Sequence, residues 1–309
     1  MRLTITHRTS YDYESPVLIA HNIVRLRPRD EPHQRCHAHR LAIEPRDTAL
    51  HTRRDFFGNT VDHFTVAEPH RQMSITALST VELWPRPTLA TGDCPPWEAV
   101  RERLRRERDP QTLAALPFLD DSPRIRVSPE LRAYAERSLT PGRPIVDAIL
   151  ALTRRMHTEF TYDKRATTVT TTPEEAFRLR RGVCQDLAHV QIGCLRALGL
   201  AARYVSGYLR TRPRPGQARL VGADASHAWV GVYCGEGGWV DVDPTNDVLP
   251  ALDHVTVAWG RDYSDVSPIA GIYVGGDRQT LEVAVEVVAE DDRASAEEAT
   301  PRWDRLTPR

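Results

Sequence analysis

The first third of the chain alternates short apolar and polar stretches. Residues 1–88 contain runs rich in Thr, Val, Ile and aromatic residues, each bounded by Pro, Asp, Gly or Asn. Examples are RLTITHRTSYDY, HRLAIEP, TVDHFTVAE and SITALSTVEL. Short β-prone runs between turn-forming residues are typical of an antiparallel sheet. We therefore expect residues 1–88 to form an N-terminal antiparallel β domain.

The periodicity changes to that of helices over residues 89–160. The run WEAVRERLRRERD at 97–109 is charged at most positions, which indicates a solvated helix. The tripeptide Ser-Pro-Glu at 128–130 supplies a cap, a first-turn proline and a first-turn acid for another helix. Residues 145–160 carry apolar side chains at helical intervals. Residues 89–160 are therefore predicted to form a helical connecting region.

Two consecutive helices are predicted around Cys184. Thr172 and Glu175 form a capping box, with proline at the first helical position, so a short helix begins there. A second helix must follow almost at once, because apolar residues recur at intervals of three and four from residue 183 onward. It ends at Gly199, a residue suited to the left-handed C-terminal position. Cys184 therefore lies in the first turn of a core helix.

This position suits Cys184 for nucleophilic chemistry. A thiol attacks as the thiolate, and the unpaired N–H groups of a helix N-terminus stabilise negative charge. The same N–H groups can hold an oxyanion. A free cysteine is more often a small buried residue, which is what we expect of Cys194 in the same helix. The location at the helix start is what favours a catalytic interpretation of Cys184.

A histidine and two aspartates follow on a predicted pair of strands. By alternation, His227 and Trp229 share one face of the first strand, and Asp241 and Asp243 share one face of the second. If the turn comprises residues 235–237, Asp243 lies opposite Trp229 and one diagonal step from His227; a four-residue turn separates them. The sequence permits this register without deciding it. A carboxylate beside a histidine fixes its tautomer, as a thiol nucleophile requires.

Four stretches together resemble the core of the bacterial transglutaminase-like superfamily in order and spacing. They are GVCQDLAH (182–189), RALGLAARYVSGYL (196–209), DASHAWV (224–230) and GWVDVDPTN (238–246). The β-rich first domain and residues 254–276 also look like bacterial members of that family. The resemblance implies an α+β, papain-like fold over residues 161–289, with a nucleophile helix packed on an antiparallel sheet. It places a catalytic Cys-His-Asp triad on Cys184, His227 and Asp243, the acid that directly precedes a Pro-Thr pair.

The resemblance implies a thiol enzyme that acts on an amide carbonyl through a thioester, as a cysteine peptidase or amidase on a peptide or protein substrate. Protein-glutamine acyl transfer, or cross-linking, is the alternative; animal transglutaminases have Trp where this chain has Gln185. Arylamine N-acetyltransferases share the order of triad residues, but the N-terminal β domain and the downstream motifs disfavour that class. A catalytically inactive binding scaffold would be free to lose Cys, His or Asp, and all three are present.

Other residues that carry chemistry receive structural interpretations. Asp186 is placed to cap the helix that Cys184 begins. Trp229 and Trp239 could line a substrate groove, although core packing is the more common fate of strand tryptophans. One group resembles metal ligands without matching a zinc spacing, and we predict neither metal nor cofactor. That group comprises His33, Cys36, His37 and His39.

Composition narrows the cellular context. The chain of 309 residues carries 41 Lys plus Arg against 42 Asp plus Glu, so no strong field exists to recruit nucleic acid or an anionic membrane. No apolar run approaches the roughly 20 residues that span a bilayer, and the N-terminus does not resemble a signal peptide, so we expect a cytoplasmic protein. Five cysteines without C-x-x-C spacing are expected to be reduced thiols. Residues 290–309 are acidic, Ala-rich and interrupted by Pro, which predicts a disordered tail; the oligomeric state is left open.

Overall fold

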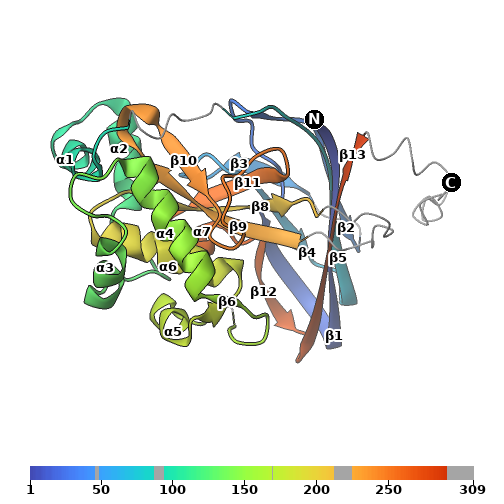
Figure 1. The fold of residues 1–309 in the computed structure, drawn as a ribbon. Coiled ribbons are helices and arrows are strands. Elements are labelled where there is room, and N and C mark those ends of the chain that lie inside the picture. The colour runs from blue at the N-terminus through green and yellow to red at the C-terminus, as the bar shows by residue number, and fades with distance from the viewer. Residues whose placement is uncertain (46–48, 87–93, 169, 212–224, 291–309) are drawn as a thin grey trace, which may run out of the picture.

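The computed structural model describes residues 1–45, 49–86, 94–168, 170–211 and 225–290 (Figure 1). All but the first residue of the tail predicted at 290–309 lie outside these ranges. Within them, no helix has both the length and the apolar character needed to cross a membrane. A four-stranded core sheet lies between a group of helices and a larger N-terminal sheet (Figure 1). The predicted α+β fold, with an N-terminal antiparallel β domain, is confirmed.

The N-terminal sheet is antiparallel and is built around one long strand, β1. Its main order is β2-β5-β1-β4-β3, and two C-terminal strands, β12 and β13, also pair with β1. Buried and exposed side chains alternate along β1, as they do when one face of a strand packs on a core. The strands are β1 (Arg2–Val24), β2 (Gln34–Glu44), β3 (His51–Arg54), β4 (Thr60–Val66), β5 (His70–Leu83), β12 (Ile269–Gly275) and β13 (Gln279–Ala289).

The strands that follow His254 divide between the two sheets. Residues 161–289 were expected to hold the core together with C-terminal strands whose placement the sequence did not decide, and β12 and β13 extend along β1. A strand as long as β1 needs a partner along each edge, or its backbone groups stay unpaired. A Gly-Gly-Asp turn lies between β12 and β13, where Gly275, Gly276 and Asp277 all have positive φ. The chain thus turns locally and continues along the same edge of β1.

The core sheet has the order β10-β9-β8-β11 and is antiparallel. Val242 pairs with Val230, so that Asp243, the next residue, falls opposite Trp229. A short 3₁₀ turn at Gly235–Gly237 joins β9 to β10, which is the three-residue turn that the productive register requires. The strands are β8 (Ala202–Leu209), β9 (Ala225–Tyr233), β10 (Trp239–Val242) and β11 (His254–Gly260); β6 (Thr161–Tyr162) and β7 (Arg181–Gly182) form a separate small parallel pair.

The helices begin where the capping signals place them. Ser128 accepts a hydrogen bond from the N–H of Leu131 at 3.3 Å, and Thr172 and Glu175 form the expected capping box. The nucleophile helix α6 packs against β8 and β9. Apolar side chains of α6, of the core sheet and of the N-terminal sheet form one continuous hydrophobic cluster. The helices are α1 (Trp97–Arg106), α2 (Pro110–Ala115), α3 (Pro129–Glu136), α4 (Ile145–Glu159), α5 (Pro173–Leu179), α6 (Cys184–Ala197) and α7 (Tyr263–Val266).

Two side-chain amides join the N-terminal sheet to β11, an edge strand of the core sheet. Gln34 donates to the carbonyl of Thr256 at 2.7 Å and accepts from its N–H at 2.7 Å. Asn59 makes the same pair of hydrogen bonds with the backbone of Trp259, at 2.8 and 3.0 Å. Because the amides satisfy backbone groups that an edge strand leaves unpaired, they hold the two sheets in a defined relative position.

Candidate active site

Cys184 is the first residue of α6 and is partly buried, whereas the rest of that helix is largely enclosed in the core. The helix is capped from inside by Asp186, whose Oδ2 accepts from the N–H of Val183 at 2.8 Å and from the Thr167 hydroxyl at 2.6 Å. Gly182 makes room for this cap, because a Cβ there would lie 2.5 Å from Oδ2 of Asp186. The predicted cap-like role of Asp186 is therefore confirmed, and it fixes the helix start beneath Cys184.

Removing this cap is expected to destabilise the protein. Asp186→Ala leaves the partly buried Val183 N–H and Thr167 hydroxyl without their acceptor, so the free energy of unfolding should fall by about 1–3 kcal/mol. Urea unfolding of wild type and variant measures the difference. Asp147→Ala is the control, since it removes a carboxylate from the first turn of α4; its loss should stay below about 1 kcal/mol. Equal losses would contradict a specific cap at Asp186.

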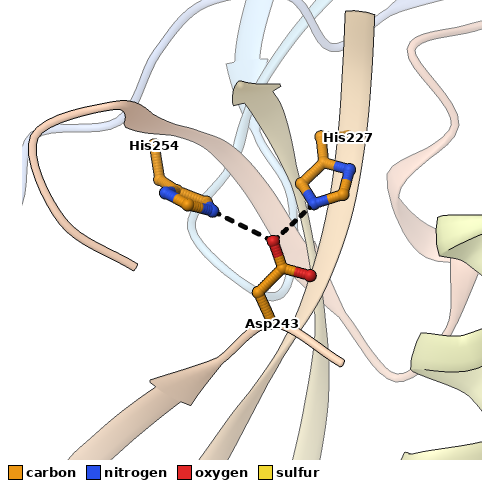
Figure 2. Close-up of side chains that lie close together, drawn as sticks. All are labelled: His227, Asp243 and His254. Atoms are coloured by element: carbon orange, nitrogen blue, oxygen red, sulfur yellow. Dashed lines mark hydrogen bonds and ion pairs between the residues drawn. The ribbon is translucent and has the colours of Figure 1, made fainter. Parts of the chain in front are cut away.

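His227 and Asp243 form a close buried pair at the end of the core sheet. Nε2 of His227 lies 2.7 Å from Oδ2 of Asp243, and Asp243 is fully enclosed (Figure 2). The other oxygen, Oδ1, accepts from the N–H groups of Thr245 at 2.9 Å and Asn246 at 3.3 Å. The Asn246 side chain donates to Oδ2 at 2.7 Å. Asp243 is thus an ionised acceptor held by its own turn, in a position to orient the imidazole.

His254 completes this group and was not identified from the sequence. Its Nε2 lies 3.1 Å from the same Oδ2 that His227 contacts (Figure 2). Both imidazoles are buried, and Nδ1 of His254 has no hydrogen-bond partner in the described part of the chain. His254 is the first residue of β11 and opens the stretch 254–276 that resembles bacterial members of the family. That resemblance did not mark His254 itself, and the pairing of β11 with β8 brings it to Asp243.

The electrostatics of the group favour an ion pair. Burial disfavours charge on Asp243, but hydrogen bonds from His227, His254 and Asn246 hold the pKa of its carboxyl well below the usual range. Burial likewise acts to lower the pKa of His227, and hydrogen bonds to Asp243 and Cys184, together with their negative charges, outweigh it and raise that pKa to about 10. The imidazole therefore carries its proton at neutral pH.

The Cys184 thiol is the third member of this network. It lies close enough to His227 to help raise the pKa of the imidazole. Because Nε2 of the ring is engaged by Asp243, Nδ1 is the nitrogen left for the sulfur. Burial and the charge of Cys184 raise the pKa of Tyr162, a residue 49% exposed that lies where the site meets solvent. Of the three residues that the sequence singled out, His227 and Asp243 are thus in direct contact, and Cys184 lies near enough to influence the pKa of His227.

Trp229 and Asp241 form the layer beneath the two imidazoles. The Trp229 ring is fully buried, 5.4 Å from the His254 ring and 6.2 Å from the His227 ring, so it packs in the core as predicted. Its N–H donates to Oδ2 of Asp241 at 3.2 Å. Asp241, the alternative acid, also pairs with Arg86 at 2.7 Å, and within the described part of the chain it makes no hydrogen bond to His227. The geometry therefore favours Asp243 as the partner of the histidine.

One group of side chains in the described part of the chain has the composition and spacing of metal ligands. His227, Asp243 and His254 each offer one ligand atom, all within 4.8 Å of one another, but their nitrogens already hydrogen-bond the shared oxygen. In the group formed by His33, Cys36, His37 and His39, two histidines have partners of their own. His37 pairs with Glu82 at 2.8 Å and His39 with Ser79 at 2.9 Å.

Comparison with known proteins agrees with this geometry. The sequence matches the "Bacterial transglutaminase-like N-terminal region" over residues 3–82 and the "Transglutaminase-like superfamily" over residues 132–244. An uncharacterised protein of Mycobacterium tuberculosis is 42% identical over 93% of this chain and 92% of its own length. A related protein of Mycobacterium leprae is 32% identical over 93% of this chain and 98% of its own length.

Two further similarities concern the core and the fold. A protein-glutamine gamma-glutamyltransferase of Pseudomonas aeruginosa is 34% identical over 127 residues, which are 40% of this chain and 19% of that enzyme. The crystal structure of a "Putative Cysteine Protease" from Cytophaga hutchinsonii superposes with a TM-score of 0.71 at 22% identity, covering 94% of this chain and 91% of that one. The core geometry, the matched regions and the near full-length relatives lead to one conclusion: this chain belongs to the transglutaminase-like superfamily.

Proposed function

We propose that this chain is a thiol amidohydrolase that cleaves peptide or protein amides, with Cys184 as nucleophile, His227 as acid and base, and Asp243 as the group that orients the histidine. The observation that carries the proposal is the His227 imidazole, which a buried carboxylate binds at Nε2 and whose pKa is raised by Asp243 and by the neighbouring Cys184. A nucleophile in contact with a base, and a base oriented by a third group, are what covalent catalysis at a carbonyl requires.

The first half of the reaction forms a thioester. The Cys184 thiolate adds to the amide carbonyl carbon, and the C=O electron pair moves to the oxygen. Protonated His227 then gives its proton to the departing amine nitrogen as the C–N bond breaks. The Cys184 N–H, at the first helical position and without an acceptor inside α6, is one donor for the oxyanion. In the second half, neutral His227 takes a proton from water, which attacks the thioester and restores the thiolate.

Acyl transfer to an amine is the second candidate. It is supported by the local similarity to the Pseudomonas aeruginosa glutamyltransferase around the core. Both activities share the thioester and differ only in the nucleophile that resolves it. Incubation with a glutamine-containing peptide and a fluorescent primary amine separates them: ammonia release without labelled peptide supports hydrolysis, whereas labelled peptide supports transfer.

Selective alkylation tests the thiolate-imidazolium pair without a known substrate. We expect iodoacetamide to modify Cys184 first between pH 5 and 7, because only a thiolate reacts and protonated His227 stabilises it. Burial raises the pKa of Cys194 to about 12 and also raises the pKa of Cys36 and Cys234, so those thiols should react slowly. Peptide mapping by mass spectrometry over pH 5 to 9 gives the rate at each cysteine.

His227→Ala should lower the alkylation rate of Cys184 at pH 6 by at least about tenfold, since one unit of thiol pKa corresponds to 1.36 kcal/mol of lost stabilisation. His21→Ala, which removes an exposed histidine from β1, should leave the profile unchanged. If Cys184 in the native protein reacts no faster than the other thiols, or reacts equally without His227, the catalytic assignment fails and the scaffold alternative replaces it.

A further inference from the structure

A cavity of about 580 Å³ lies between the N-terminal sheet and the core sheet. Glu31, His33 and Arg86 line it from the N-terminal side, and Arg203, Asp241 and Trp259 line it from the core sheet. Its size falls within the range of small-ligand sites. Cys184, His227 and Asp243 are not among its lining residues, so it is separate from the proposed catalytic centre.

One wall of this interdomain cavity is a stack of charged and aromatic groups. The Arg203 guanidinium lies between the Trp239 ring at 4.3 Å and the Trp259 ring at 3.6 Å. The Arg29 guanidinium lies 3.5 Å from the centre of the Trp259 ring. Stacking satisfies the flat faces of these cations, whereas their edges need hydrogen-bond acceptors. The wall therefore presents rigid planar surfaces together with oriented N–H groups.

Some of these edges have no acceptor. Arg86 uses Nη1 to bind Asp241 at 2.7 Å, but its Nε and Nη2, which form the bidentate edge of the guanidinium, have no partner in the described part of the chain. Nε of Arg203 also has no hydrogen-bond partner there, and only 8% of the Arg203 surface is exposed. Gly231 lies between Arg203 and Asp241 across the sheet, where a Cβ would come within 3.0 Å of both. Even so, Nη2 of Arg203 lies 4.0 Å from Oδ1 of Asp241.

The charges of the cavity do not balance. Glu31 is paired with Arg29 at 2.9 Å, and Asp241 is the remaining acid for Arg86 and Arg203. Burial lowers the pKa of His33 to about 4, so His33 is neutral at physiological pH. One guanidinium is thus in excess. Because an uncompensated buried cation is costly, the site favours a ligand that brings one negative charge.

The opposite end of the cavity is apolar. Phe56 and Leu113 contribute to its lining with side chains that are 80% and 46% exposed. Phe118 extends this surface inward, 5.3 Å from the Trp239 ring. A ligand with its charge at the arginines would therefore place its hydrophobic part against aromatic side chains.

We propose that the interdomain cavity binds a small hydrophobic carboxylic acid. The carboxylate pairs with the guanidinium groups of Arg86 and Arg203, which line the cavity, and a flat apolar group lies along Trp239 and Phe118 toward Phe56. Bidentate charge-assisted hydrogen bonds suit a carboxylate, and indole and phenyl surfaces suit a planar hydrocarbon. This proposal does not depend on the proposed amidohydrolase activity.

Isothermal titration with naphthalene-2-carboxylate tests it on the full chain. We expect the acid to bind with one-to-one stoichiometry. It should bind at least about tenfold more tightly than naphthalene-2-carboxamide, which has one neutral oxygen and an NH2 group in place of the two oxygens that share the negative charge. Arg86→Gln should lower the affinity for the acid at least about tenfold and should change the affinity for the amide little. Arg40→Gln, which removes an exposed arginine from β2, is the matched control and should leave both unchanged. Leu113→Asp places a carboxylate in the apolar part of the lining and should lower the affinity for the acid, because the two negative charges repel each other.

Cys184→Ala separates this site from the thiol site and should bind the acid as wild type does. Equal affinity for acid and amide, undiminished binding to Arg86→Gln, loss of binding in Cys184→Ala, or no heat up to millimolar acid would each overturn the proposal. Circular dichroism of Arg86→Gln establishes that the variant is folded, and Leu113→Asp, at a half-exposed position, provides an independent test should it not be.

Discussion

Cys184→Ala is expected to abolish amide cleavage, with kcat/KM falling by at least about 10⁴-fold, because no other group in the site can form the thioester. The measurement is amine or ammonia release from a glutamine-containing peptide library, followed by kinetics on the best substrate. Mass spectrometry of the wild type under rapid quench should also detect an acyl adduct on Cys184 that the variant lacks. Together these results would establish covalent catalysis.

Cys36→Ser is the matched control for the loss of a partly buried thiol. Cys36 lies on β2 of the N-terminal sheet and donates to the carbonyl of Ala38, away from the catalytic group. Its replacement should leave kcat/KM within about twofold of wild type. Residual activity in Cys184→Ala comparable to wild type would rule out Cys184 as the nucleophile, whatever the substrate.

Asp243→Asn is expected to lower kcat/KM by about 10³–10⁴-fold, the effect of removing the orienting carboxylate from a triad. The neutral amide cannot hold two imidazole N–H groups as Oδ2 does at 2.7 and 3.1 Å. The pKa of His227 should fall because its main opposing charge is lost, so fast alkylation of Cys184 should shift to higher pH. Kinetics and the iodoacetamide profile measure both effects on one sample.

The same variant should change how stability depends on pH. Because the folded-state pKa of Asp243 is depressed, its contribution is present above the unfolded-state value of about 4 and is lost as pH falls below it. The wild type should therefore lose stability between about pH 5 and pH 2 more steeply than Asp243→Asn. Urea unfolding at several acidic pH values gives the two slopes; identical slopes would show that Asp243 is not held ionised by its neighbours.

Asp247→Asn is the control for both measurements. Asp247 lies in the same turn, pairs with Arg154 at 3.3 Å and has a φ of 53°, a left-handed conformation that asparagine also adopts. Its side chain bonds Arg154 and, among the residues that the structure describes, makes no hydrogen bond to His227. Its replacement should leave kcat/KM and the loss of stability at acidic pH nearly unchanged. A loss as large as that of Asp243→Asn would point to a turn effect and not to the carboxylate itself.

Local patterns in the sequence were sufficient for the helix that begins at Cys184, for the β structure of residues 1–88 and for the strand pair that carries His227 and Asp243. The cap formed by Thr172 and Glu175, the apolar repeat after residue 183 and the glycine at 199 place Cys184 at a helix start, and α6 begins there. These signals are local, since capping and amphipathic periodicity act over a few residues. The motif order was also sufficient to identify the superfamily.

The sequence by itself thus determined which three residues carry the candidate chemistry and which elements hold them. Only the tertiary structure decided the register that sets Asp243 opposite Trp229, because two turn lengths were compatible with the same residues. It also decided the paths of β12 and β13 along β1, the approach of His254 to Asp243 and the cavity at Arg86 and Arg203. Each of these depends on which distant strands become neighbours, and pairing of that kind is set by packing and backbone satisfaction across the whole chain, so no local pattern records it.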